Sequence, residues 1–165
     1  LEHPRAKEIV NGIQQIIPKY DQVILIKKEH PHNHVIFAAN HPWRKPWQTI
    51  SGNWGEMTLW PFHTIEGSYG ADWISDFALQ PDYFLLTVGM NPAVNYRNFF
   101  EEVAFSSFIT KEQIDELNFA GFCFTEGIHQ TALHAETLGI KSLILTTLIS
   151  SVPELEELHH HCLQH

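Results

Sequence analysis

Histidines alternate with other residues in a short stretch near the start of the chain. His30, His32 and His34 are each separated by one residue, so in an extended segment their side chains share one face. Imidazole is a good ligand for first-row divalent metals, and with a fourth ligand from elsewhere this group can hold zinc, iron or nickel. A solvated polar loop explains the same pattern equally well, so the residues alone leave both interpretations open.

A second segment has the pattern of a strand followed directly by a helix. Apolar residues lead up to Gly121, and from Ile128 apolar positions recur at helical spacing until Gly139 ends the run. The turn between strand and helix lies at the positive end of the helix dipole, where a thiol ionises easily. Gly127 stands in this turn and has no side chain to attack a carbonyl. Cys123, four residues earlier among phenylalanines, is more typical of a buried structural thiol.

The overall composition predicts one domain with a substantial apolar core. Of the 165 residues 44% are apolar, and ten basic against nineteen acidic residues give a net charge of −9. This charge argues against nucleic acid or an anionic membrane as the main partner. No apolar run approaches the roughly 20 residues of a membrane span, and no signal-like segment opens the chain. With only two cysteines, Cys123 and Cys162, we expect a cytoplasmic protein.

The elements that must position these residues alternate between helices and strands. Apolar spacing predicts helices over 4–19 (ended at Pro18), over 95–105, from Ile128 and from Pro153, with helical turns at 71–77 and 111–116. Short apolar runs predict strands at 23–26, 82–88, 117–122 and 142–147. Such alternation is typical of an α/β fold with a largely parallel sheet. Residues 38–63 show no sustained period and are more typical of a binding or active-site loop.

Three segments resemble motifs of the nicotinamidase/isochorismatase-like cysteine hydrolases. Residues 29–38 (Glu-His-Pro-His-Asn-His-Val-Ile-Phe-Ala) are similar to Asp-x-His-Pro-x-x-His-x-Ser-Phe-Ala, and residues 60–71 (Trp-Pro-Phe-His-Thr-Ile-Glu-Gly-Ser-Tyr-Gly-Ala) to Trp-Pro-x-His-Cys-x-x-Gly-Thr-x-Gly-Ala. Residues 121–135 resemble the strand-to-helix motif Gly-hydrophobic-Ala-Thr-Asp-x-Cys-Val-x-x-Thr-Ala. The resemblance covers nearly the whole chain. It implies a single domain over 1–165 with a three-layer α/β/α sandwich and a mostly parallel, doubly wound sheet.

The resemblance implies a metal site built from histidines, with one departure. His30, His34 and His63 match the family's metal-ligand histidines, which would hold zinc or iron, but the position of the family's aspartate ligand is Lys28. An ammonium repels a divalent cation and has no acceptor lone pair. A three-histidine site completed by water, an ammonium in the metal's place, and a site without metal all stay open.

The resemblance also implies a catalytic aspartate, lysine and cysteine, none of which stands at its expected position. Without gaps, the cysteine position is Gly127 and the lysine position is Val88, while the first strand, which carries the aspartate, is absent ahead of the opening helix. Because such residues act as a unit, these losses predict a loss of hydrolysis. The expected pocket for a small aromatic ligand is lined by Trp60, Tyr96, Phe122 and Cys123.

The sequence therefore predicts a family member that has lost amide hydrolysis and serves as a binding or assembly subunit of a homo- or hetero-oligomer. A strand missing from a parallel sheet leaves unpaired backbone edges, so another chain could supply it. The alternative is an active hydrolase of nicotinamide-type amides or isochorismate-type vinyl ethers. It would use water on a histidine-bound metal or a general acid not visible in this chain. A vinyl ether needs no nucleophile, so Gly127 alone is compatible with that chemistry.

Overall fold

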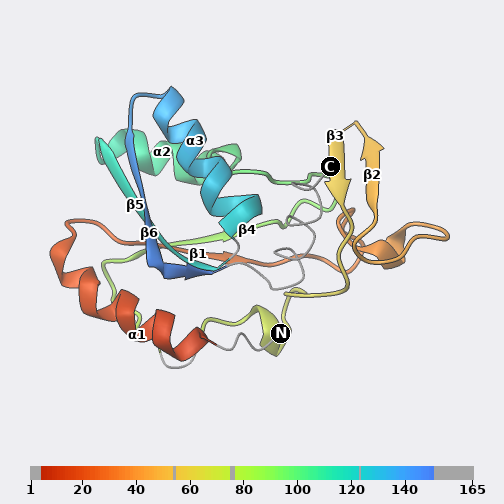
Figure 1. Cartoon of the computed structure of the whole chain (residues 1–165), viewed down its shortest axis with the longest axis horizontal. Coiled ribbons are helices and arrows are strands. Elements are labelled where there is room, and N and C mark those ends of the chain that lie inside the picture. The colour runs from red at the N-terminus through yellow and green to blue at the C-terminus, as the bar shows by residue number, and fades with distance from the viewer. Residues whose placement is uncertain (1–4, 54, 75–76, 123, 151–165) are drawn as a thin grey trace. The chain divides into compact units, whose positions relative to one another are not determined.

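The structure, a computed structural model, describes residues 5–53, 55–74, 77–122 and 124–150, with residues 124–126 as backbone only (Figure 1). These residues form two compact units. The first unit comprises residues 22–96, and the second comprises residues 5–21 together with 97–150. The predictions of a single domain and of three layers stay predictions.

The first unit is built on a parallel strand pair and an antiparallel hairpin. Strands β1 (Ile24–Lys28) and β4 (Phe84–Val88) pair in parallel, with Lys28 opposite Val88. Their apolar, largely branched residues suit a buried strand. The hairpin of β2 (Thr49–Gly52) and β3 (Gly55–Thr58) lies inside the stretch for which the sequence predicted no regular structure. Two four-residue strands with glycine at their inner ends are too short to show a period of two.

The core of the first unit lies where the segment after β1 meets the segment after β3. Isolated parallel bridges join His30 to Ile65 and Phe37 to Trp60. Short 3-10 turns follow each bridged segment, at Ala38–Asn40 and at Tyr69–Ala71. The second of these turns lies just before the helix or turn expected over 71–77, of which residues 75–76 lie outside the described residues. The buried apolar side chains of this core are Ile36, Phe37, Ala38, Met57, Leu59, Trp60, Ala71, Leu86 and Val88.

The second unit contains a parallel strand pair and three helices. Its elements are α1 (Ala6–Ile16), α2 (Val103–Lys111), β5 (Glu116–Phe122), the π-helical turn η5 (Phe124–His129), α3 (Gln130–Thr137) and β6 (Lys141–Ser150). Strands β5 and β6 pair in parallel, with a register irregularity between Phe119 and Gly121. Helix α1 buries Ile9 and Val10, and Gly12 lies against the side chain of Leu148 on β6. A 3-10 turn containing Pro18 follows α1, which agrees with a helix ended by proline.

The second helix lies later in the chain than its apolar spacing predicted. A 3-10 turn occupies Phe99–Glu101, where the Asn98 side chain accepts a hydrogen bond from the Phe100 backbone N–H. Helix α2 then ends before Gln113, which has a positive φ of 54°. The stretch 111–116, where a helical turn was expected, contains the last residue of α2, a short connection and the first residue of β5. The predicted terminal helix from Pro153 lies outside the described residues. The predicted α/β class is confirmed, and none of the described helices is long and apolar enough to cross a membrane.

Candidate functional site

The first unit brings the three histidines of the resemblance close together. The ring centroid of His30 lies 4.4 Å from that of His34 and 5.4 Å from that of His63. The backbone explains this meeting, because His30 N–H donates to the Thr64 carbonyl (2.9 Å) and ties the two motifs side by side. The Trp60 ring completes the group, with its centroid 5.1 Å from that of His63. We call His30, His34, His63 and Trp60 the histidine cluster.

His32 does not join the histidine cluster. The segment after His30 is a turn rather than an extended strand, because His34 N–H donates to the Pro31 carbonyl (3.0 Å). The His32 ring instead lies against Phe62, with centroids 5.5 Å apart. The expectation that three alternating histidines share one face is therefore wrong, since it required an extended backbone that proline and asparagine do not favour here.

Burial keeps the histidines of the cluster neutral. His30 is 4% exposed and His34 is 1% exposed. Burial in a medium that solvates charge poorly lowers the pKa of His30 to about 3 and that of His34 to about 4, and it also lowers the pKa of His63. The positive charge of Lys28 contributes to the lowering of all three pKa values. All three imidazoles therefore carry one proton near neutral pH.

Backbone hydrogen bonds decide which ring nitrogen holds that proton. His30 Nδ1 lies 2.9 Å from the Gly89 carbonyl, and His63 Nδ1 lies 2.9 Å from the Pro61 carbonyl. Because a carbonyl only accepts, both Nδ1 atoms are donors and both Nε2 atoms carry a lone pair. His34 is the opposite case, since its Nδ1 accepts from the Ile36 backbone N–H (3.1 Å) and its proton therefore sits on Nε2.

Gly89 makes the hydrogen bond of His30 possible. Its φ is +91°, in the left-handed region that glycine adopts at little cost. A Cβ at this position would overlap Cε1 of the His30 ring and stand 3.1 Å from the Glu29 carbonyl oxygen. A glycine directly after β4 therefore lets the buried imidazole approach the backbone and fixes its tautomer.

Several buried polar atoms of this unit have no hydrogen-bond partner among the described residues. They include Nε2 of His30, Nε2 of His34, Nε1 of Trp60 and Oγ1 of Thr64. A buried donor or acceptor without a partner costs roughly 1–3 kcal/mol, so native proteins keep few of them. Three of these four atoms belong to the histidine cluster, so unpaired buried polar atoms are concentrated there among the described residues of this unit.

Lys28 faces the histidine cluster, whereas its neighbour Lys27 does not. Lys27 Nζ forms an ion pair with Glu29 Oε2 (3.1 Å), and Glu29 Oε1 accepts from the Gly67 backbone N–H (3.1 Å). Side chains alternate along a strand, so Lys28 points to the other face with His30. Glu29 is thus engaged elsewhere and does not replace the missing aspartate.

These residues do not fit a divalent metal. Over the described part of the chain, no three His, Cys, Asp or Glu side chains are arranged to hold a metal ion. The expected three-histidine set fails at His34, whose Nδ1 is occupied and whose Nε2 carries a proton. His30 and His63 supply two lone pairs, and an ammonium stands where the resemblance requires a carboxylate. Two neutral ligands beside a fixed positive charge form a poor site for a cation.

The positions that correspond to catalytic residues are apolar. Val88 is 2% exposed in the first unit. In the second unit the Phe99 ring lies against Gly127, with Cζ 3.3 Å from where a Cβ would stand. The hydroxyl of the fully buried Thr131 donates to the Gly127 carbonyl (2.7 Å) and accepts from the Phe99 N–H (2.8 Å).

The four residues predicted to line the ligand pocket are divided between the units. Trp60 is buried and Tyr96 half-buried in the first unit, and Phe122 is half-buried on β5 in the second. Cys123 lies outside the described residues. A pocket formed by all four therefore stays a prediction.

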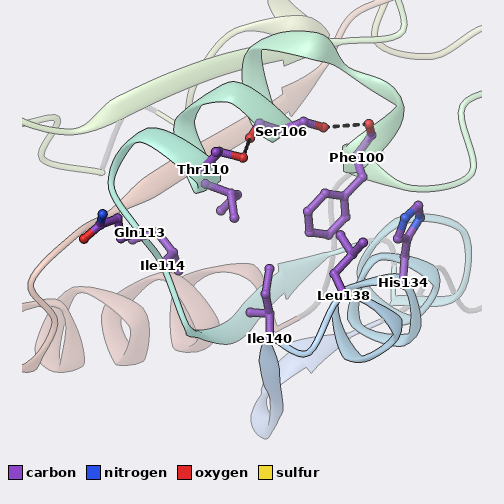
Figure 2. Close-up of a pocket in the computed structure, with 9 residues that line it drawn as sticks. Phe100, Ser106, Thr110, Gln113, Ile114, His134, Leu138 and Ile140 are labelled. Atoms are coloured by element: carbon purple, nitrogen blue, oxygen red, sulfur yellow. Dashed lines mark hydrogen bonds between the residues drawn. The ribbon is translucent and has the colours of Figure 1, made fainter.

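A cavity of about 510 Å³ lies in the second unit, where α2 faces the end of α3 and the turn that follows it (Figure 2). The Phe100 and His134 rings stack on one side, with centroids 4.9 Å apart. The hydroxyls of Ser106 and Thr110 donate to the carbonyls of Phe100 and Ser106 (2.9 Å each), drawn as dashed lines in Figure 2. Sequence reasoning did not single out this cavity, because its lining has the pattern of an ordinary core. The residues around it are Phe100, Ser106, Ile109, Thr110, Gln113, Ile114, His134, Leu138 and Ile140.

Comparison with known proteins finds sequence relatives among nicotinamidases. No family model matches the chain. The nicotinamidase of Acinetobacter baylyi is 24% identical in an alignment of 161 positions, gaps included, that covers 94% of this chain and 75% of that protein. The nicotinamidase of Saccharomyces cerevisiae is 25% identical in an alignment of 187 positions, gaps included, that covers 96% of this chain and 87% of that protein.

Solved structures agree with the sequence relatives. The nicotinamidase/pyrazinamidase of Acinetobacter baumanii superposes with a TM-score of 0.85 at 25% identity, covering 99% of this chain and 84% of the other. The yeast nicotinamidase superposes with a TM-score of 0.79 at 22% identity, covering 98% and 88%. The pyrazinamidase of Pyrococcus horikoshii, solved in complex with zinc, gives 0.73 at 18% identity, covering 98% and 83%. This chain is therefore similar to nicotinamidases over nearly its whole length, and it shares their isochorismatase-like fold.

Proposed function

We propose that this chain is a family member that binds a small aromatic ligand at the histidine cluster and does not hydrolyse amides. The observation that carries the proposal is the turn at Gly127. This position offers no nucleophile, and the Phe99 ring occupies the space next to it. Val88 adds a second apolar residue at a position where the resemblance requires a lysine.

The histidine cluster supports ligand binding independently of the lost catalytic residues. It combines aromatic faces with polar atoms of both kinds. The Nε2 lone pairs of His30 and His63 accept hydrogen bonds, whereas Nε2–H of His34 and Nε1–H of Trp60 donate them. A flat ring with one polar substituent can stack on the aromatic side chains and satisfy these atoms. We therefore expect an aromatic ligand that carries a carbonyl and an N–H or O–H group.

Hydrolysis assays test the loss of activity. Purified protein should release no ammonia from nicotinamide or pyrazinamide and should not cleave isochorismate, with or without added Zn²⁺ or Fe²⁺. An active nicotinamidase relative at the same concentration is the positive control. Turnover that disappears in His63→Ala would overturn the proposal in favour of the alternative predicted from the sequence, an active hydrolase.

Binding assays test the retained pocket. Titration of nicotinamide followed by calorimetry should give saturable heat that is weakened at least about tenfold in Trp60→Ala, because stacking and a buried donor are lost together. The matched control is Trp43→Ala, since Trp43 is 99% exposed. Absence of binding by nicotinamide and related carboxamides would contradict ligand binding. An assembly role in a homo- or hetero-oligomer would then be examined by light scattering and by co-purification.

A further inference from the structure

We propose that the ammonium of Lys28 takes the place of a divalent metal ion in this protein, so that the histidine cluster works without metal. A ligand would then accept a hydrogen bond from Lys28 and donate one to the Nε2 lone pair of His30 or His63. This inference rests on the proposed ligand binding at the cluster. It also states the charge and hydrogen-bonding pattern that such a ligand must match.

The first argument is the strand register. Lys28 of β1 lies directly opposite Val88 of β4 in a parallel pair, so the two side chains emerge on the same face. The resemblance expects an aspartate at the first position and a lysine at the second. The structure has a lysine at the first and a small apolar residue at the second. A positive charge has therefore been kept on this face, but one strand away from its expected position.

The second argument is that nothing neutralises this charge. Among the described residues, the Lys28 side chain makes no hydrogen bond or ion pair, whereas the Lys27 side chain is paired with Glu29 on the opposite face. A divalent cation placed among the rings of the cluster would meet this charge with no carboxylate nearby to offset it.

The third argument is the hydrogen-bond inventory of the cluster. Metal-ligating histidines typically donate their second N–H to a carbonyl, and His30 and His63 have kept this arrangement. What remains is two oriented lone pairs beside a cation that offers three donors and no acceptor. This pattern complements a neutral molecule with adjacent acceptor and donor atoms, such as a carboxamide, and leaves too few ligands for a metal ion.

Metal titration of four proteins decides the inference without measuring activity. We would titrate Zn²⁺ by calorimetry and Co²⁺ by visible absorption into wild type, Lys28→Asp, Lys28→Met and Lys27→Asp. Lys28→Asp removes the charge and adds a carboxylate beside His30 and His63. It should bind one equivalent of Zn²⁺ at least about 100-fold more tightly than wild type. Lys27→Asp makes the same change of charge on the opposite face and should behave as wild type.

Two outcomes would overturn the inference. One is a wild-type protein that binds one equivalent of Zn²⁺ as tightly as Lys28→Asp. The other is a Lys28→Asp protein with a native circular dichroism spectrum that gains no metal affinity. Lys28→Met removes the repelling charge without adding a ligand. We expect its gain in Zn²⁺ affinity over wild type to be less than about a tenth of the gain in Lys28→Asp.

Ligand binding gives a second readout. Nicotinamide affinity should be unchanged by a chelator in wild type and should fall about tenfold in Lys28→Met, because a charge-assisted hydrogen bond is lost. Loss of nicotinamide affinity on chelation would contradict the inference while leaving ligand binding intact. If no carboxamide binds at all, the proposed function fails, and the metal titration still decides the role of Lys28.

Discussion

The histidine cluster and the turn at Gly127 both bury polar groups, but they differ in whether those groups have hydrogen-bond partners. Both place polar groups in a buried environment near the end of a strand. At the turn, Thr131 satisfies the Gly127 carbonyl and the Phe99 N–H with one hydroxyl. In the cluster, two imidazole nitrogens and an indole N–H stay without partners among the described residues.

This difference indicates where function has been kept. A satisfied buried network is stable by itself and needs no ligand, whereas an unsatisfied one gains stability when a ligand completes it. The volume of a cavity is a poorer guide to function than the unpaired polar atoms around it. The cavity of about 510 Å³ beside α2 has apolar walls, and its hydroxyls already donate to main-chain carbonyls. The comparison therefore supports the proposal of ligand binding at the cluster and favours a structural role for the turn.

The strongest test of the comparison is pH. Unfolded histidines have a pKa near 6.5, whereas the folded values of His30 and His34 lie at about 3 and about 4. Between these limits the unfolded chain binds more protons, so stability is complete above about pH 6.5 and declines as the pH falls toward the folded values. Two such groups predict a loss of about 4 kcal/mol between pH 7 and pH 5, measurable by urea unfolding.

The control for this pH profile is His32→Gln, at an exposed position of the same turn. We expect it to keep the wild-type slope, whereas His34→Gln should flatten the slope by about half. A wild-type unfolding free energy that stays constant from pH 7 to pH 5 would contradict the buried, neutral state of the cluster.

Substitution of Gly89 tests how the backbone holds the cluster together. Gly89→Ala places a methyl group against the His30 ring at a φ of +91°, and we expect a loss of about 3 kcal/mol by chemical unfolding. Gly67 is the matched control, because its φ is +70° and no atom lies within 4 Å of the point where an added methyl group would stand. Gly67→Ala should lose only about 1 kcal/mol, the cost of the backbone conformation. Equal losses would show that contact with His30 is unimportant.

The turn is tested by removing its bridging hydroxyl. Thr131→Val keeps the side-chain shape but leaves the Gly127 carbonyl and the Phe99 N–H unpaired, which predicts a loss of about 2 kcal/mol. Thr137→Val is the control, since that hydroxyl is exposed and donates to the His134 carbonyl. The control should change stability by less than about 0.5 kcal/mol. A similar small effect at both sites would refute the bridging role of Thr131.

The smallest expected effect comes from restoring the missing thiol. Gly127→Cys requires the Phe99 ring to move by only a few tenths of an ångström, so we expect a stability change within about 1 kcal/mol. Because Val88 stands where the resemblance requires a lysine and leaves the thiol without this partner, ammonia release from nicotinamide should stay at background. Turnover by this single variant would show that the loss of the nucleophile alone silenced the site.

The sequence predicted four of the strands well because their runs of apolar residues are longer than those expected by chance. The strands expected at 23–26, 82–88, 117–122 and 142–147 correspond to β1, β4, β5 and β6. The hairpin of β2 and β3 could not be predicted, because its strands are short and contain glycine. Helix α2 was placed too early, since the capping by Asn98 and the positive φ of Gln113 depend on local geometry rather than on apolar spacing.

For the candidate site, the motifs predicted that His30, His34 and His63 come together but not the state of each imidazole. Strand alternation was sufficient to place Lys28 and Glu29 on opposite faces. The tautomers could not be predicted, because they depend on which backbone carbonyl or N–H each imidazole meets. His34 shows this most clearly, since one hydrogen bond from the Ile36 N–H removes it from the set of possible ligands.

Lys27 and Lys28 show how strictly the length of β1 is constrained. The two side chains are chemically identical, and only the two-residue repeat of a strand separates an ion-paired lysine from an uncompensated one. Insertion of a single residue between Lys28 and His30, with His30 held in place, would exchange their roles. Such a slip would turn Lys27 toward the cluster and Lys28 toward the face on which Glu29 and Gly67 lie. Chain length here is therefore under the same constraint as residue identity.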